Sequence, residues 1–174
     1  MDEVRFRLLY EQAARPLLSY VLRVTGDKAL ADDVLQESCL RLLQADLTDV
    51  SDDKLKSYLF STATNILRDE WRRKRKERIR EGSESAEAST IHDQSATDLR
   101  YTFQMAFDDL SPQQRSLLWL AYVEGYQHKE IAAMLKLRAK SVRVLLFRAR
   151  HKLSNILTAM GIGKEYYEQS DLSV

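Results

Sequence analysis

The chain has 174 residues and a formal net charge of +1, and 44% of the residues are hydrophobic and 30% charged. Five glycines and two prolines are few turn-forming residues for this length, which favours long helices over a β-rich fold, in one domain or two small ones. The single cysteine, Cys39, excludes an internal disulfide and a cysteine metal cluster, and the absence of a membrane-spanning apolar run or a signal peptide predicts a cytoplasmic protein without membrane insertion.

The first segment with helical periodicity covers residues 4–24, where apolar residues recur at the spacing of one helix face. Pro16 lies inside this segment and lacks the backbone N–H that a helix interior needs. The sequence therefore predicts either two short helices or one kinked helix. The following Thr25-Gly26-Asp27 is typical of a turn that caps the next helix.

Two further helices are predicted before residue 81. Residues 29–43 are amphipathic, and we expect Leu40 in their apolar stripe. A polar loop follows, after which Asp52 or Asp53 is expected to cap a long helix over residues 54–80.

A change of composition separates this first part from a second one. Residues 81–98 (EGSESAEASTIHDQSATD) carry five acids and no base, which is the composition of a linker. Beyond it, Ser111-Pro112 is a helix start with serine as N-cap and proline at the first helical position. A short helix over 128–135, a turn at Lys136-Leu137 and a long helix over 139–160 complete the prediction.

The last two predicted helices have the pattern of a helix-turn-helix. Their apolar stripes consist of Ile131, Ala132 and Leu135 in the first helix, and of Val142, Leu146, Ala149 and Leu153 in the second. Such stripes pack two helices at a steep angle across a tight turn. Exposed cations on the second helix suit DNA phosphates and base edges in the major groove, whereas the alternative is an ordinary solvated basic helix. The residues expected off the core stripe are Arg138, Lys140, Ser141, Arg143, Val144, Phe147, Arg148 and Arg150.

Positive charge is concentrated in two segments. Residues 61–80 carry eight bases and three acids, and residues 111–160 carry nine bases and two acids. Two separate basic segments predict two contacts with a polyanion, one in each domain. In the first, Tyr58, Phe60 and Trp71 share a helix with Ser61, Thr62, Thr64 and Asn65. Aromatic and amide groups beside cations suit stacking on unpaired bases, although we expect at least one of these aromatics in the core.

An acidic face is predicted on the helix over residues 29–43. It consists of Asp32, Asp33, Gln36 and Glu37, for which no matching base is expected four residues later, and it is either a solvated surface or a docking face for a basic partner. No catalytic constellation is apparent, because His92, His128 and His151 are scattered and no glycine-rich phosphate loop is present. We therefore expect no enzyme, no metal site and no cofactor.

These segments together resemble a bacterial RNA polymerase sigma factor of the extracytoplasmic-function (ECF) group, over roughly residues 5–80 and 100–157. ALADDVLQESCLRLL is similar to the family helix that docks on the clamp helices of the polymerase β′ subunit, and the resemblance assigns this contact to Asp33, Gln36 and Glu37. KSYLFSTATNILRDEWRRKRK resembles the segment that melts and reads the minus-ten promoter element. Its matching residues are Tyr58, Asn65, Asp69, Arg72 and Arg73. The helix-turn-helix resembles the one that reads the minus-thirty-five element.

The resemblance implies an all-α protein made of two small helical domains joined by a flexible acidic linker. The expected ranges are a first domain over 1–80, the linker over 81–98, a helix-turn-helix domain over 99–160 and a tail over 161–174. The implied partners are core RNA polymerase, through its β′ clamp helices and β flap, and promoter DNA, and an anti-sigma factor is a further candidate partner. The implied function is transcription initiation without catalysis. The alternatives are a sigma-like decoy that binds an anti-sigma factor and a plain helix-turn-helix regulator.

The sequence departs from the family pattern at a few positions. Ser61 and Thr64 stand where the family often has arginine, which predicts weaker contacts with the DNA backbone. Lys136 occupies a turn position usually held by glycine, so a positive φ is expected at a non-glycine residue. Val144 and Leu145 replace residues that are more often polar or basic, which leaves the upstream sequence preference open.

Overall fold

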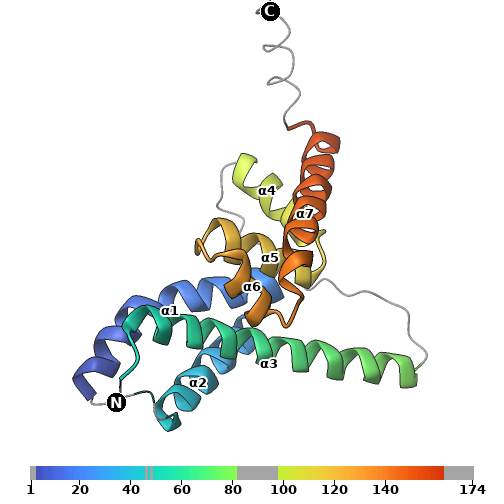
Figure 1. Ribbon diagram of the computed structural model, residues 1–174. Helices are drawn as coiled ribbons and strands as arrows, with labels where there is room; N and C mark the ends of the chain where they lie inside the picture. Colours follow the sequence, from blue (N-terminus) through green and yellow to red (C-terminus); the bar gives the residue numbers. More distant parts are fainter. Residues whose placement is uncertain (1–2, 46, 48, 82–97, 163–174) are drawn as a thin grey trace, which may run out of the picture.

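The computed structural model describes residues 3–45, 47, 49–81 and 98–162, and this part of the chain contains seven helices and no strand. The helices are α1 (Glu3–Thr25), α2 (Lys28–Gln44), α3 (Asp52–Glu81), α4 (Asp98–Asp108), α5 (Pro112–Tyr122), α6 (His128–Met134) and α7 (Ala139–Ala159). Helices α1 to α3 pack together as one bundle and α4 to α7 as another, with the second half of α3 extending beyond the body (Figure 1). The all-α, two-domain fold expected from the sequence is confirmed. Most of the expected linker and tail lie outside the described residues.

Helix α1 is continuous through Pro16, so of the two expected alternatives the two short helices are wrong and the single helix holds. Proline removes one backbone hydrogen bond and costs about 3 kcal/mol in a helix interior. Ala13, Leu17 and Tyr20 on either side of it are fully buried, and burial of side chains of this size stabilises the helix by more than that cost.

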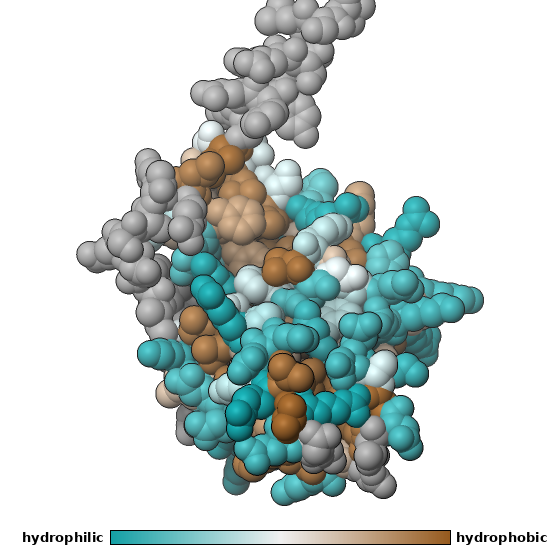
Figure 2. Space-filling model, turned by 90° about the vertical axis from the view of Figure 1, so that its left-hand side faces the viewer, coloured by the Kyte–Doolittle hydropathy of each residue, from teal (hydrophilic) through white to brown (hydrophobic). Residues whose placement is uncertain are grey.

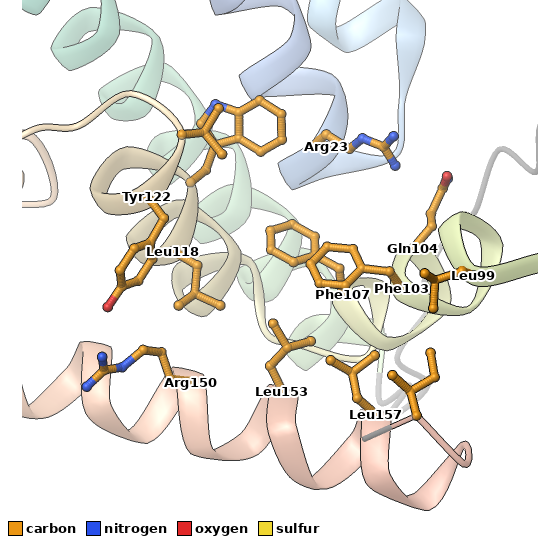
Figure 3. A pocket seen from close by; sticks show the side chains of 13 residues that line it. Arg23, Leu99, Phe103, Gln104, Phe107, Leu118, Tyr122, Arg150, Leu153 and Leu157 are labelled. Atoms are coloured by element: carbon orange, nitrogen blue, oxygen red, sulfur yellow. The ribbon is translucent and has the colours of Figure 1, made fainter. Parts of the chain in front are cut away.

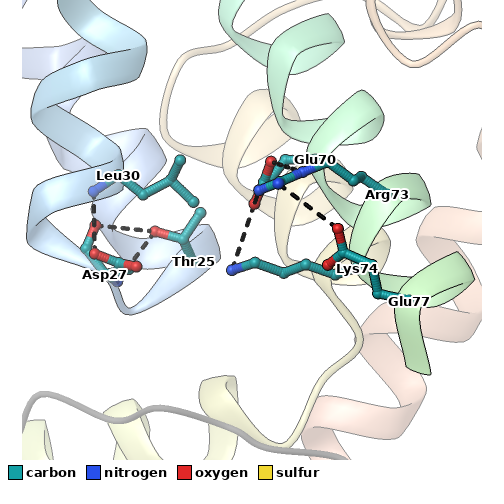
Figure 4. Close-up of polar contacts among 7 residues, drawn as sticks. All are labelled: Thr25, Asp27, Leu30, Glu70, Arg73, Lys74 and Glu77. Carbon is teal, nitrogen blue, oxygen red and sulfur yellow. Dashed lines mark hydrogen bonds and ion pairs between the residues drawn. The ribbon is translucent and has the colours of Figure 1, made fainter. Parts of the chain in front are cut away.

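The predicted turn between α1 and α2 is confirmed. Gly26 has a φ of 70°, and an Asp27 side-chain oxygen accepts a hydrogen bond of 3.0 Å from the backbone N–H of Leu30 (Figure 4). The Thr25 hydroxyl donates to the Val21 carbonyl and accepts from the backbone N–H of Asp27. These bonds satisfy groups that the two helix ends would otherwise leave unpaired.

The predicted cap of α3 is wrong. The first helical hydrogen bond runs from the Leu55 N–H to the Ser51 carbonyl, so Ser51 occupies the cap position and Asp52 and Asp53 lie in the first turn. Asp52 instead pairs with Arg5 of α1, at 2.9 Å. Carboxylates in a first turn still favour the helix, because they face its partially positive end.

Burial corrects the expectations for Leu40 on α2 and for Thr62 and Thr64 on α3. Phe60 and Thr64 are fully buried and Thr62 nearly so, whereas Leu40 is 53% exposed and does not belong to the core stripe. The Thr64 hydroxyl donates to the Phe60 carbonyl and lies 3.0 Å from the Tyr20 hydroxyl. Phe60, Thr62 and Thr64 therefore make no contact with nucleic acid in this state, and the expectation of one core aromatic is confirmed by Phe60.

The second domain follows the predicted signals closely. Ser111 and Gln114 form a reciprocal capping box at the start of α5, with Pro112 at its first position. Lys136 has a φ of 49°, as expected for the turn between α6 and α7. The two predicted stripes of the helix-turn-helix are buried or, at Leu153, partly buried.

The two domains pack against each other, α1 on α5 and α3 on α6. Buried Arg115 of α5 donates to the Val24 carbonyl at the end of α1 at 3.1 Å, and to the Leu110 and Asp108 carbonyls of its own domain at 3.0 and 2.8 Å. Burial has the largest effect on the pKa of Arg115 and lowers it. Arg115 of the second domain thus satisfies a carbonyl at the C-terminal end of α1 in the first domain.

Within the described residues, no helix is long and apolar enough to cross a membrane, and no group of three or more metal-ligating side chains occurs.

Candidate nucleic-acid and partner interfaces

The outward side of α2 carries the residues predicted to dock a partner. Asp33 and Gln36 are exposed, and Glu37 accepts a hydrogen bond of 2.7 Å from the Nε of Arg41. The expectation that this acidic face lacks a matching base is therefore wrong, because Arg41 lies four residues after Glu37. Asp32 and Asp33 make no ion pair within the described residues, and Asp33 is the more exposed of the two.

Leu40 belongs to this face although the sequence analysis assigned it to the core. Positions 33, 36, 37 and 40 follow the spacing i, i+3, i+4, i+7, which is one side of a helix. That spacing is the signal by which the sequence could have identified Leu40. We call Asp33, Gln36, Glu37 and Leu40 the docking face: an exposed apolar side chain surrounded by polar and acidic groups.

Four of the residues predicted to read a minus-ten element lie on one side of α3. Tyr58, Asn65, Asp69 and Arg72 are separated by seven, four and three residues, and we call them the α3 strip. Asp69 and Arg72 are exposed, and Tyr58 and Asn65 are half-buried. The Asn65 Oδ1 is buried and has no hydrogen-bond partner within the described residues. This amide oxygen is therefore able to accept a hydrogen bond from a ligand.

Arg73, the fifth predicted residue, is held by carboxylates beside the strip. It contacts Glu70 at 2.7 Å and Glu77 at 3.7 Å, and Lys74 also contacts Glu70 at 3.7 Å (Figure 4). The hydrogen bond from Arg73 is the largest cause of the lowered pKa of Glu70. Contact of Arg73 with a phosphate therefore requires exchange of these ion pairs.

The projecting end of α3 carries cations that, unlike Arg73, are not held by carboxylates of the described chain. Arg75, Lys76, Arg78 and Arg80 are exposed, and no ion pair to them occurs within the described residues. Lys76 lies four residues after Arg72 and so continues the α3 strip. It was not among the predicted contact residues, although the same helical spacing points to it.

The outward side of α7 presents the predicted upstream-reading residues. Lys140, Val144 and Phe147 follow one another at spacings of four and three, and Val144 and Phe147 are 49% and 59% exposed. Arg143 and Arg148 flank them and are also exposed. Arg138 precedes the helix as its cap residue, and Ser141 is half-buried in its first turn. We call this side of α7 the α7 outer face.

His151 extends the α7 outer face by one more turn. Its ring lies 6.2 Å from that of Phe147, and its Nδ1 accepts a hydrogen bond of 3.1 Å from the Asn155 side-chain amide. The sequence analysis treated His151 as an isolated histidine. Its spacing of four residues from Phe147 places it on the same side.

A separate apolar groove lies on the second domain. It has a volume of about 760 Å³ and is lined mainly by leucine and aromatic side chains of α4, α5 and α7, with Arg23 of α1 and Arg150 of α7 on different sides (Figure 3). Leu99, Phe103 and Tyr122 in its lining are 62%, 48% and 58% exposed. Figure 2 shows hydrophobic side chains gathered near the upper end of one face on a largely hydrophilic surface. The sequence analysis did not predict this groove.

Comparison with known proteins places these surfaces in context. Residues 9–77 match the family Sigma-70 region 2, and residues 100–153 match Sigma-70, region 4. Among curated proteins, the chain is 31% identical over 160 residues to the ECF RNA polymerase sigma factor SigL of Mycobacterium tuberculosis, with 90% of each chain covered. It is 28% identical over 152 residues to the ECF RNA polymerase sigma factor EcfG of Rhodopseudomonas palustris, covering 86% and 83% of the two chains.

Solved structures share the fold. The sigma factor RpoE of Bartonella quintana, in complex with the anti-sigma factor NepR, has a TM-score of 0.72 and 22% sequence identity, over 88% of this chain and 97% of that one. CnrH in complex with the cytosolic domain of CnrY has a TM-score of 0.64 and 24% identity, over 91% and 90% of the two chains.

Proposed function

Because this chain belongs to the ECF group of RNA polymerase sigma factors, and so directs polymerase to promoters as a transcription initiation factor, we propose that three of its surfaces divide that work. The docking face binds core polymerase, the α3 strip binds the minus-ten element, and the α7 outer face reads the minus-thirty-five element. The observation that carries this assignment is the exposure, in one chain, of two separate cationic surfaces with aromatic side chains and one acidic surface.

Core polymerase binds the docking face through both charge and apolar contact. Asp33 offers an unpaired carboxylate to a basic helix, and Leu40 offers apolar area at the C-terminal end of the same face. Charge sets the orientation and speed of association, while the buried apolar side chain supplies much of the affinity. The partner element is the pair of β′ clamp helices, as the family resemblance implies.

The α3 strip holds the opened minus-ten element. Tyr58 offers a ring that is not fully buried, and Asn65 offers an amide with an unpaired oxygen, both suited to unstacked bases. Arg72 and the cations beyond it neutralise phosphates as the strands separate. Arg73 also binds a phosphate once its ion pair with Glu70 is broken. Thr64 is buried and takes no part in DNA binding. Packing in the core of this chain therefore explains why threonine stands there in place of arginine.

The α7 outer face enters the major groove of the upstream element. Lys140 and Arg143 lie in the first turns of the helix, where a recognition helix meets base edges. Arg148 lies further along and reaches phosphates, and exposed Val144 and Phe147 contact thymine methyl groups. The preferred upstream site is accordingly rich in thymine.

The apolar groove of the second domain receives an apolar segment of a protein partner. We assign it to the β flap of polymerase, the second polymerase contact that the family resemblance implies. The two solved neighbours are complexes with anti-sigma factors, and such a factor is a further candidate partner. We assign the chain to the cytoplasm, where polymerase and promoters are, and no step in this proposal needs catalysis by the chain itself.

Transcription from a defined promoter tests the proposal. Purified chain and core polymerase are combined with a template that carries both elements, and transcripts are compared with those from core polymerase alone. The expected result is a start at one site that depends on the chain and on both elements. Transcription no greater than that of core polymerase, over a panel of candidate promoters selected by binding, would contradict it. The decoy alternative predicts that second outcome.

A further inference from the structure

Helix α7 ends in a glycine turn at the wall of the apolar groove. The backbone N–H of Ile162 donates to the Leu157 carbonyl at 2.9 Å, and that of Gly161 donates to the Thr158 carbonyl at 3.0 Å. Gly161 has a φ of 87°, so these bonds form a Schellman motif, in which glycine ends the helix and the next residue packs on its last turns. Ile162 and Leu157 both line the groove. The last described residue thus lies in the groove wall, and the chain beyond it starts there.

The lining of the groove indicates the chemistry of an occupant. Leu99, Phe103 and Tyr122 are 62%, 48% and 58% exposed, and an exposed apolar surface of this kind marks a binding site. The charged side chains of the lining are Arg23 and Arg150 (Figure 3). Neither makes an ion pair within the described residues, and the Arg150 guanidinium lies 6.0 Å from the ring centre of Tyr122. The groove therefore suits a segment with aromatic or other apolar side chains and with carboxylates.

Residues 163–174 (GKEYYEQSDLSV), which follow this groove-lining turn directly, have such a composition. They carry three acids and one base, and two adjacent tyrosines, Tyr166 and Tyr167, precede Glu168. Tyrosine buries a large apolar ring while its hydroxyl stays in contact with water at the edge of a site. The other long segment outside the described residues, 82–97, is also acidic but has no aromatic residue. Charge and aromatic content together therefore favour residues 163–174 as the occupant.

The reach of an extended chain gives the register of this segment on α7. Arg150 lies twelve residues before Ile162, which is about 18 Å along a helix. An extended chain advances about 3.3 Å per residue, so Glu168, six residues after Ile162, reaches back about 20 Å, to the level of Arg150. Tyr166, at about 13 Å, reaches the level of Leu153. Because successive side chains of an extended chain point to opposite sides, Tyr166 and Glu168 share one side and the tyrosine between them takes the other.

We propose that residues 163–168 run back along α7 in the free chain and occupy the apolar groove. Tyr166 then lies in the groove beside Leu153, and the Glu168 carboxylate pairs with Arg150. This inference rests on the proposed function, which assigns the same groove to the β flap, and it adds an internal competitor that the flap displaces. A segment joined to its site by a few residues has an effective concentration on the order of 1 mM, so weak contacts are enough to cover the groove.

Binding of the dye anilinonaphthalene sulfonate (ANS) to the full chain measures how open the groove is. This dye combines aromatic rings with an anionic group, which is the chemistry that the groove suits, and it binds exposed apolar surface. The test variants are Tyr166→Ala and Glu168→Arg. The matched controls, Tyr167→Ala and Glu165→Arg, make the same changes on the opposite side of the segment. Phe103→Ala, combined with Tyr166→Ala, checks that the dye lies in the groove.

Both test variants are expected to bind ANS about threefold to tenfold more tightly than the unsubstituted chain, which corresponds to a groove covered for roughly 70–90% of the time. Both controls should bind ANS as the unsubstituted chain does, and Phe103→Ala should remove the gain of Tyr166→Ala. No gain in either test variant, a gain in only one of them, equal gains in Tyr166→Ala and Tyr167→Ala, or a gain that Phe103→Ala leaves intact would each overturn the inference.

Binding to core polymerase separates this inference from the proposed function. Tyr166→Ala is expected to bind core polymerase about threefold to tenfold more tightly than Tyr167→Ala, measured by fluorescence anisotropy of labelled full chain, because the flap no longer competes with the segment. If the ANS results are as expected but the two variants bind polymerase equally, the assignment of the groove to the β flap is wrong, and residues 163–168 remain its occupant. If the ANS results fail while polymerase binds, the inference about the segment is wrong and the proposed function stands.

Discussion

The docking face gives a quantitative prediction at Leu40. Burying a whole leucine side chain stabilises a contact by about 1.5–3 kcal/mol, and Leu40 has 53% of its surface still exposed in the free protein. Roughly half of that stabilisation, about 1 kcal/mol, is therefore available to a partner. Leu40→Ala is expected to weaken binding to core polymerase about fivefold, measured by fluorescence anisotropy of labelled protein. Its own free energy of unfolding should change by less than about 0.5 kcal/mol.

Leu8 provides a matched control for this measurement. It is 55% exposed on α1 of the same domain, so Leu8→Ala removes the same atoms from a similarly exposed position. It is expected to leave polymerase binding unchanged. Equal losses in the two variants would show that general apolar area, and not the docking face, drives association. An unchanged affinity in Leu40→Ala would remove Leu40 from the contact and leave the face to its charges alone.

Three further outcomes follow from particular side chains. Arg143→Ala should weaken DNA binding by about 1–3 kcal/mol and relax the preference at one or two base pairs, whereas Arg148→Ala should weaken binding to all sites alike and lower the slope of affinity against salt concentration by about one. Binding to a library of upstream sites at two salt concentrations separates the two effects. Equal and uniform losses would contradict the placement of α7 in the groove. Lys136→Gly relieves a φ of 49° and should stabilise the chain by about 1 kcal/mol in urea unfolding, while no gain would show that the turn is unstrained. Burial raises the pKa of Tyr126 from 10.0 to about 12, so the folded state keeps a proton that the unfolded chain releases; stability should fall as pH rises from 10.0 to about 12, and urea unfolding should show this fall reduced in Tyr126→Phe.

Features set by a few neighbouring residues could be predicted from the sequence. Ser111-Pro112 specifies its helix start through one hydroxyl and one fixed φ, and Asp27 caps α2 through a bond to a residue three positions on. The turn between α6 and α7 follows from the two apolar stripes on either side of it, which are buried or partly buried as expected, whereas the positive φ of Lys136 was expected from the family pattern. In each case the deciding interaction spans only a few positions along the chain.

Features set by distant packing could not be predicted in the same way. From the sequence, Phe60 is a candidate base-stacking residue, but in the structure Tyr126, 66 residues later, packs against it. The hydrogen bond of Arg115 to the Val24 carbonyl likewise joins residues 91 positions apart. Leu40 shows the reverse: it looks like part of an apolar stripe, but no element of the described chain packs over it. Periodicity identifies sides of a helix, and only the arrangement of helices decides which side is covered.

Charge within the first domain separates its two proposed partners. On α3, the acids Asp69, Glu70 and Glu77 each contact a neighbouring base, so the helix presents an excess of positive charge from Arg72 onward. On α2, Asp33 makes no ion pair within the described residues, and we propose that its carboxylate repels DNA and attracts a basic polymerase helix. Exposed charges further apart than about 8 Å are largely screened at physiological salt, so each face acts mainly on a partner in direct contact with it. In the proposed function, a chain with a net charge of only +1 therefore binds polymerase and promoter through opposite charges on two helices of one small domain.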